Sequence, residues 1–163
     1  MTEIGFYHLT RTAAEAALPQ LLGRTLAAGE RAVVLCRTEA RLAALDEALW
    51  ACAQPDWLPH GTARDGDADL QPIWLTTMGQ AGMDQAGMDQ AGADEAPNGA
   101  RFLFLVEGAE TVRLTAFVRV FDLFDGNDAD AVAAARARWS AAQAAGHTLT
   151  YWQQGERNWE RKR

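Results

Sequence analysis

The sequence predicts an α/β protein built around a mostly parallel sheet. Short apolar runs alternate along the chain with longer stretches of helical periodicity, an alternation that is typical of parallel strands joined by right-handed crossovers. The run at residues 31–37 (RAVVLCR) has a continuous apolar middle, as expected for a strand that is covered on both faces. The length of 163 residues fits one domain with a substantial core.

The first half of the chain predicts two strand–helix pairs. The apolar, aromatic segment 4–9 (IGFYHL) predicts the first strand, and we expect the helix after it to begin near Pro19 and to end at Gly29. After the second strand, Thr38 is suited to cap a helix that runs to about Ala51. Leucines form the buried faces of the two helices: Leu18, Leu21, Leu22 and Leu26 in the first, and Leu42, Leu45 and Leu49 in the second.

The second half predicts more strands and one long helix. After a loop-like stretch at 53–70, the chain predicts strands at 72–76, 101–106, 116–124 and 147–153, and an alanine-rich helix from Asp128 to about Ala145. A five-residue repeat (AGMDQ, AGMDQ, AGADE) predicts a flexible acidic loop within an insertion at about 79–98. The predicted domain covers residues 1–154, and residues 155–163 form a charged tail that we expect to be mobile at its end.

Charge and motif content exclude several kinds of function. The formal net charge of −7 works against broad binding to nucleic-acid phosphates. No glycine-rich dinucleotide loop follows the first strand, and no GxxxxGK[ST] phosphate loop occurs, since the only lysine is Lys162. His8, His60 and His147 lie in separate segments without the spacing of metal ligands. We therefore expect no metal, no cofactor and no catalytic residues.

Other features predict a cytoplasmic protein. The N-terminus lacks the pattern of a signal peptide, and no apolar run reaches the roughly 18 to 20 residues that a membrane span needs. Two cysteines, Cys36 and Cys52, suit a reducing compartment better than a disulfide scaffold, and burial is their expected role.

Two of the six tryptophans lie where a partner protein could dock. Trp50 follows the buried Leu49 at the end of the second helix, and Trp57 lies in the proline-bounded loop PDWLPHG. Exposed aromatic side chains at a helix end and on a nearby loop can anchor an interface. The alternative is that both tryptophans fold under the loop as a satellite of the core, and these residues alone do not decide between the two.

The last predicted helix carries a mixed stripe. Val132, Arg136, Trp139 and Gln143 are spaced i, i+4, i+7 and i+11, opposite a face that is nearly all alanine. An arginine between valine and tryptophan suits a ligand that is apolar in one part and anionic in another. Its guanidinium would hold a partly desolvated carboxylate with about 1.5–3 kcal/mol. Taken alone, these residues favour the simpler interpretation of a solubilising amphipathic face, to which Arg138 would also contribute.

Seven segments follow one another in a specific order: FYHL, RAVVLC, LDEALW, WLPHG, NGARFLFLVEGAE, FDLFDGND and ARARWSAAQAAGHTLTYWQQ. In this order they resemble the chi subunits of the bacterial DNA polymerase III holoenzyme, over nearly the whole chain apart from the repeat insertion and the tail. LDEALW followed closely by WLPH is the most specific part of the pattern. The resemblance implies a three-layer αβα, Rossmann-like single domain and a non-catalytic adaptor that links the clamp loader to single-stranded-DNA-binding protein.

The resemblance also implies a binding site for the acidic, phenylalanine-terminated tail of single-stranded-DNA-binding protein. Arg136 matches the arginine that holds the carboxylate of the tail, and Trp139 matches an aromatic residue beside it. Phe124, or Leu123 if the alignment is shifted by one, matches an apolar wall. Val132 stands where some members have lysine, which removes one cation from the site.

A second implied surface contains Trp50 and Trp57. It would receive the psi subunit of the clamp loader or, alternatively, a repair helicase, while the chain itself would bind neither nucleic acid strongly nor a membrane. A less favoured alternative is a nucleotide-dependent enzyme on a Rossmann-like frame, and the missing glycine loop speaks against it.

Overall fold

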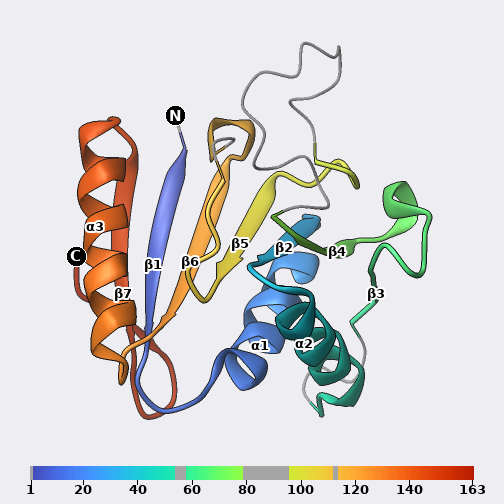
Figure 1. The fold of residues 1–163 in the computed structure, drawn as a ribbon, viewed down its shortest axis with the longest axis horizontal. Helices are drawn as coiled ribbons and strands as arrows, with labels where there is room; N and C mark the ends of the chain where they lie inside the picture. Colours follow the sequence, from blue (N-terminus) through green and yellow to red (C-terminus); the bar gives the residue numbers. More distant parts are fainter. Residues whose placement is uncertain (1, 54–57, 79–95, 112–113) are drawn as a thin grey trace.

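In the computed structural model, which describes residues 2–53, 58–78, 96–111 and 114–163, an eight-stranded sheet has the order β3-β4-β2-β5-β6-β1-β7-β8 (Figure 1). The strands are β1 (Glu3–Leu9), β2 (Ala32–Cys36), β3 (His60–Gly61), β4 (Ile73–Thr77), β5 (Phe102–Val106), β6 (Arg119–Asp125), β7 (Thr148–Gln154) and β8 (Trp159–Arg161). The described α-helices are α1 (Ala14–Ala27), α2 (Glu39–Ala51) and α3 (Ala129–Ala144). All strand pairs are parallel except β7–β8, so the predicted α/β class is confirmed.

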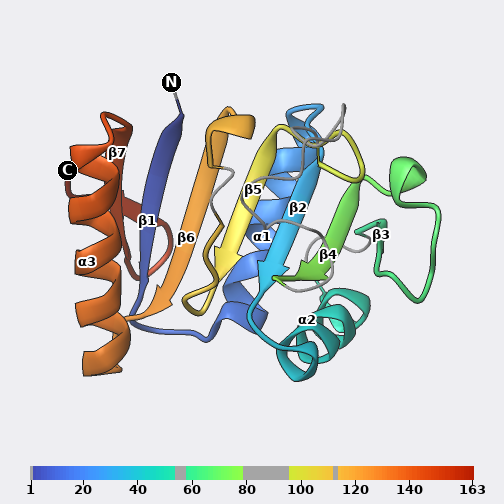
Figure 2. The ribbon, with the colours of Figure 1, turned by 45° about the horizontal axis from the view of Figure 1, so that its top comes forward.

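The helices cover both faces of the sheet. On one face, α1 and α2 bury their leucines against one side of the strands, with Leu18 and Leu45 fully enclosed. On the other face, α3 packs Ala135 and Ala142 into a second cluster that includes Phe6. In both views of the ribbon, α3 lies at the β1–β7 end, and α1 and α2 lie toward β2 and β4 (Figures 1 and 2). The expected three-layer αβα arrangement is therefore confirmed.

Helix α1 begins earlier than the sequence predicted. Its first residue is Ala14, and Pro19, near which we expected the helix to begin, lies inside it. Proline removes one backbone hydrogen bond, but Ala14, Ala17 and Leu18 are buried around it, and this packing holds the first turns in place. Gly29, which has a φ of +77°, follows the helix end as predicted.

Helix α2 follows the prediction closely. The Thr38 side chain accepts a hydrogen bond from the Arg41 backbone N–H at 3.2 Å, and the helix ends at Ala51. Its buried residues are the predicted ones: Leu42, Leu45 and Leu49. Before it, Cys36 is buried at the end of β2, and neither this residue nor the half-buried Cys52 forms a disulfide.

Two short strands were not predicted. β3, in the stretch expected to be a loop, pairs His60 with Ile73 of β4. β8 lies within the expected tail and pairs antiparallel with β7, with Trp159 opposite Gln154. Part of the expected tail therefore forms a strand of the sheet, and this strand is too short to produce a periodic signal.

The expected insertion at 79–98 is shorter at its C-terminal side. Ala96 and Asn98 are buried, and the Asn98 side chain donates to the backbone carbonyl of Ala32 at 3.0 Å. These residues therefore belong to the folded core. The five-residue repeat at 81–95 lies outside the described residues.

Candidate functional site

A pocket of about 480 Å³ lies between α3 and the neighbouring strands β1, β6 and β7. Its lining residues are Phe6 and His8 of β1, Phe124 of β6, Val132, Ala135, Arg136, Trp139 and Ser140 of α3, Tyr151 of β7, and Arg163. The resemblance assigned Phe124, Val132, Arg136 and Trp139 to one binding surface, and the structure brings all four together. The alternative wall residue, Leu123, is fully buried in the core on the opposite face of the sheet.

The start of α3 sets the position of the pocket's cation. The helix follows β6 directly, and its N-cap residue Asp128 accepts backbone hydrogen bonds from Asp130 at 2.9 Å and Ala131 at 3.4 Å. Ala135 faces the sheet, where its small side chain allows the helix to lie close to the strands. The next residue, Arg136, is consequently directed away from the sheet at the pocket's edge.

Aromatic rings form the apolar part of the pocket. The rings of Phe6 and Trp139 lie 5.2 Å apart between their centres, and His8 stacks on Phe124 at 5.1 Å. Tyr151 approaches Trp139 edge-on at 6.3 Å, and its hydroxyl is hydrogen-bonded to Nδ1 of His8. These contacts fix the rings before any ligand arrives.

The charged side chains among the described residues that line the pocket are all positive. Arg136 is exposed, and it forms no ion pair with another described residue. Arg163 supplies a second cation, and no aspartate or glutamate is among the described lining residues. Burial raises the pKa of Tyr151, and the positive charge of Arg136 opposes this rise. In a chain of net charge −7, the side chains of this pocket thus make a locally positive region.

The neighbouring arginine of α3 behaves differently. Arg138 donates from Nε and Nη2 to the two carboxylate oxygens of Asp122, at 2.6 and 2.9 Å, and both side chains are largely buried. Burial raises the pKa of Asp122, and the two bonds from Arg138 oppose this rise. Arg138 therefore holds α3 to β6, contrary to the interpretation that it merely solubilises the helix.

A second pocket, of about 430 Å³, lies on the other flank of α3. Its walls include Glu110 and Asp122, and Arg138 is already neutralised by the latter. Among the described residues, the first pocket alone is lined by arginines that form no ion pair with an aspartate or glutamate. The geometry therefore favours the Arg136 pocket as the anion site.

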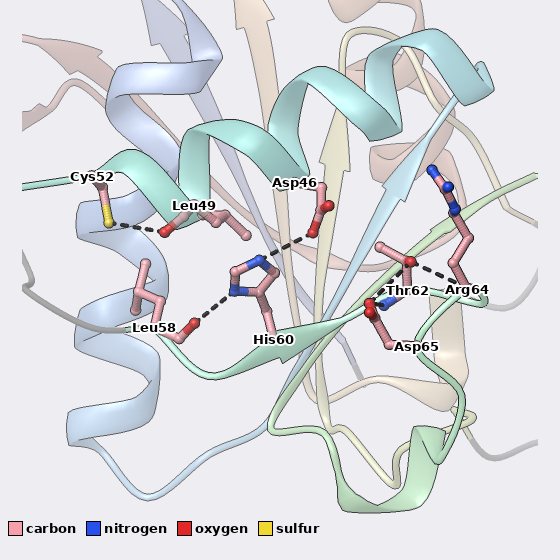
Figure 3. A network of polar contacts seen from close by, with 8 residues as sticks. All are labelled: Asp46, Leu49, Cys52, Leu58, His60, Thr62, Arg64 and Asp65. Atoms are coloured by element: carbon pink, nitrogen blue, oxygen red, sulfur yellow. Dashed lines mark hydrogen bonds and ion pairs between the residues drawn. The ribbon is translucent and has the colours of Figure 1, made fainter.

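The predicted tryptophan surface is described in part. Trp50 is 65% exposed, and its ring lies 4.6 Å from that of His60. The buried His60 has Nδ1 2.6 Å from the Leu58 carbonyl and Nε2 3.1 Å from Asp46 Oδ1 (Figure 3). The contact with Asp46 joins the start of β3 to α2 next to Trp50. Trp57 lies outside the described residues.

Six lining residues of the pocket were not predicted as site residues from the sequence: Phe6, His8, Ala135, Ser140, Tyr151 and Arg163. Phe6 and His8 alternate along β1, so period-two spacing in FYHL could have placed them on one face. Tyr151 is similarly placed on β7. Arg163 reaches the pocket because β8 pairs with β7, and no local sequence pattern predicts that strand.

These features define a small α/β protein with an aromatic, cationic pocket on one helix and an exposed tryptophan on another. The family model described as DNA polymerase III chi subunit, HolC, matches residues 1–150. The chain belongs to this family, whose members are accessory subunits of the polymerase III complex in DNA replication. The match confirms the resemblance found in the sequence.

Comparison with curated proteins finds no match to the chain. In the part of the chain that the structure describes, no helix combines the length and the apolar character that crossing a membrane requires.

Proposed function

We propose that the chain is a replication adaptor without catalytic residues of its own. In this proposal the Arg136 pocket binds the acidic, phenylalanine-terminated C-terminal tail of single-stranded-DNA-binding protein. The surface around Trp50 and Trp57 binds the psi subunit of the clamp loader. The chain thereby connects the clamp loader to protein-coated single-stranded DNA without binding the DNA itself.

The composition of the pocket carries the proposal. An exposed arginine that forms no ion pair with another described residue lies beside fixed aromatic rings, and no described carboxylate lines the pocket. A peptide that ends in phenylalanine presents a ring and a carboxylate on one residue. The ring suits the space beside Phe6, Phe124 and Trp139, and the carboxylate suits the Arg136 guanidinium.

The interaction energies predict a weak site. A charge-assisted bond between Arg136 and a carboxylate contributes about 1.5–3 kcal/mol. Burial of one phenylalanine ring adds about 1.5–3 kcal/mol. The sum, about 3–6 kcal/mol, corresponds to affinities that are millimolar or somewhat tighter. Acidic residues before the phenylalanine, and several tails presented together, would bring the apparent affinity into a useful range.

The Trp50 surface is the proposed contact for the second partner. A tryptophan that is 65% exposed leaves a large apolar area in water, and such residues often anchor protein interfaces. The contacts of His60 with Leu58 and Asp46 join residues 58–60 to α2 next to Trp50. Trp50 is thus presented on a preformed support, as an anchor for a folded partner requires.

The experiment is a titration of fluorescent peptides at low salt, monitored by anisotropy. A peptide with acidic residues and a terminal phenylalanine should bind saturably. An otherwise identical peptide with an amidated C-terminus should bind about tenfold more weakly, because it offers no carboxylate to Arg136. A peptide ending in alanine should also bind more weakly.

Equal binding of all three peptides would contradict a site that recognises the terminal residue. A complete lack of binding would refute the tail-binding role while leaving the family membership intact. For the second surface, purified psi subunit and candidate repair helicases are tested by pull-down with the Trp50→Ala chain as the control. Capture of a helicase in place of psi would favour the repair alternative.

A further inference from the structure

The pocket includes a segment that the family match does not cover. The match ends at residue 150, whereas Arg163 lines the pocket and Tyr151 forms part of its wall. The chain reaches this point through the hairpin of β7 and β8, and its end lies beside α3 in both ribbon views (Figures 1 and 2). One side of the pocket is therefore built by residues outside the matched part of the chain.

Aromatic packing holds β8 on the sheet. The Trp159 ring meets Tyr7 edge-on at 5.0 Å, and Trp152 stacks on the same tyrosine at 5.9 Å. Both tryptophans pack against the core that contains Leu18, on the face of the sheet opposite the pocket. Because side chains alternate between faces along a strand, this anchorage leaves the other face of β8 toward the pocket.

Backbone hydrogen bonds then place two cations next to Tyr151. The Lys162 N–H donates to the Tyr151 carbonyl at 2.7 Å, and the Tyr151 N–H donates to the Arg163 carbonyl at 3.2 Å. Arg161 also donates from Nε to the Arg163 carbonyl at 3.0 Å. The Tyr151 carbonyl also accepts from the Arg163 N–H at 3.4 Å, so Lys162 and Arg163 both lie opposite Tyr151, as in a β-bulge.

The positive charges of Lys162 and Arg163 come from the segment that follows β8, whereas Arg136 belongs to α3. Val132, one turn before Arg136, is apolar, so α3 offers no second cation there. Arg163 lines the pocket itself. Lys162 is not among the lining residues, and its Nζ lies 3.0 Å from Glu160 in an ion pair that, unlike that of Arg138 and Asp122, is open to water and can exchange for a carboxylate of a ligand. A ligand that leaves the pocket across Tyr151 therefore meets the positive end of β8.

We infer that the end of β8 is a second recognition element, which binds acidic side chains upstream of the terminal residue of the peptide. This inference rests on the proposed function of the Arg136 pocket. Arg136 takes the terminal carboxylate, and Lys162 and Arg163 take the upstream carboxylates. The hairpin thereby supplies the positive charge that Val132 does not, and it makes the site selective for acidic tails over other tails that end in phenylalanine.

The test compares two chains with two peptides. Lys162→Ala/Arg163→Ala removes the proposed contacts, and Arg24→Ala/Arg157→Ala removes the same charge from α1 and from the turn of the hairpin. Both peptides end in phenylalanine with a free carboxylate, and one has its upstream aspartates replaced by asparagine. At low salt, the Lys162/Arg163 variant should bind the acidic peptide about fivefold more weakly, with little change for the neutral peptide.

The outcomes separate this inference from the proposed function. The role of β8 would be overturned if the Lys162/Arg163 variant lost equal affinity for both peptides, or lost none. It would also be overturned if the Arg24/Arg157 control lost as much affinity for the acidic peptide. In each case the proposed role of the Arg136 pocket would remain. Absence of binding to the unmodified chain would overturn both. Trp159→Ala gives an independent check, because releasing β8 should reproduce the selective loss in a chain whose circular dichroism shows that it remains folded.

Discussion

Replacement of Arg136 by alanine gives the sharpest prediction for the pocket. The guanidinium is exposed and has no ion-pair partner among the described residues, so its removal should leave the free energy of unfolding within about 0.5 kcal/mol of the original value. The peptide, in contrast, loses a charge-assisted hydrogen bond. A partly desolvated bond of this kind contributes about 1.5–3 kcal/mol, and we expect the lower value because Arg136 is open to water.

A loss of about 1.5 kcal/mol is roughly a tenfold weakening. It is measured by anisotropy with the free-carboxylate peptide at low salt, and it should shrink as salt is added because the charges are screened. The peptide affinity of Arg136→Lys should lie between that of the original chain and that of Arg136→Ala, since lysine keeps the charge but loses the planar geometry that can donate two hydrogen bonds. Arg24→Ala is the matched control, because it removes an exposed helical arginine on the opposite side of the sheet.

Measurement of the amidated peptide with both chains completes a double-mutant cycle between Arg136 and the terminal carboxylate. This peptide lacks the terminal carboxylate, so Arg136→Ala should weaken its binding much less than that of the free-acid peptide. Undiminished binding of the free-acid peptide to Arg136→Ala would refute this role of the guanidinium. The role is equally refuted if Arg24→Ala causes the same loss, since the effect would then come from overall charge.

Three other predictions concern stability and accessibility. Gly126→Ala should destabilise the chain by about 1–3 kcal/mol in urea unfolding, because a Cβ there would overlap the His8 ring in the pocket wall; an unchanged unfolding midpoint would contradict this geometry. Burial raises the pKa of Cys36 to about 12, so a thiol reagent at mildly alkaline pH should modify Cys52 first and Cys36 only on unfolding; equal rates would be inconsistent with the buried position. Trp50→Ala should change the free energy of unfolding by about 1 kcal/mol or less, since the ring is 65% exposed, and a larger loss would show that Trp50 serves the core.

The regular elements could be predicted because each has a strong local signal. The continuous apolar run of β2 predicts a strand that is buried on both faces, and all five of its residues are buried. Thr38 before an apolar stripe announces the start of α2. The early start of α1 could not be predicted. Proline disfavours a helix through local geometry, whereas the burial of Ala14 and Leu18 depends on tertiary packing, which the local sequence does not reveal.

The candidate site, like the fold, could be predicted only in part. Spacing along α3 put Val132, Arg136 and Trp139 on one face, and the structure places them in one pocket. Spacing could not distinguish Arg136 from Arg138, since both look like exposed helical arginines. The difference arises from Asp122, which lies 16 residues from Arg138 in sequence and is buried beneath it. Partners that are distant in the chain decide which cation remains available.

The most direct test of the proposed peptide site uses the tryptophan indole N–H signals of the isotope-labelled chain. The six tryptophans give separate probes, with Trp139 in the Arg136 pocket and Trp50 on the other proposed surface. Addition of the acidic, phenylalanine-terminated peptide should shift the Trp139 signal in proportion to saturation and leave that of Trp50 in place. A titration that moves Trp50 and leaves Trp139 unchanged would contradict the account.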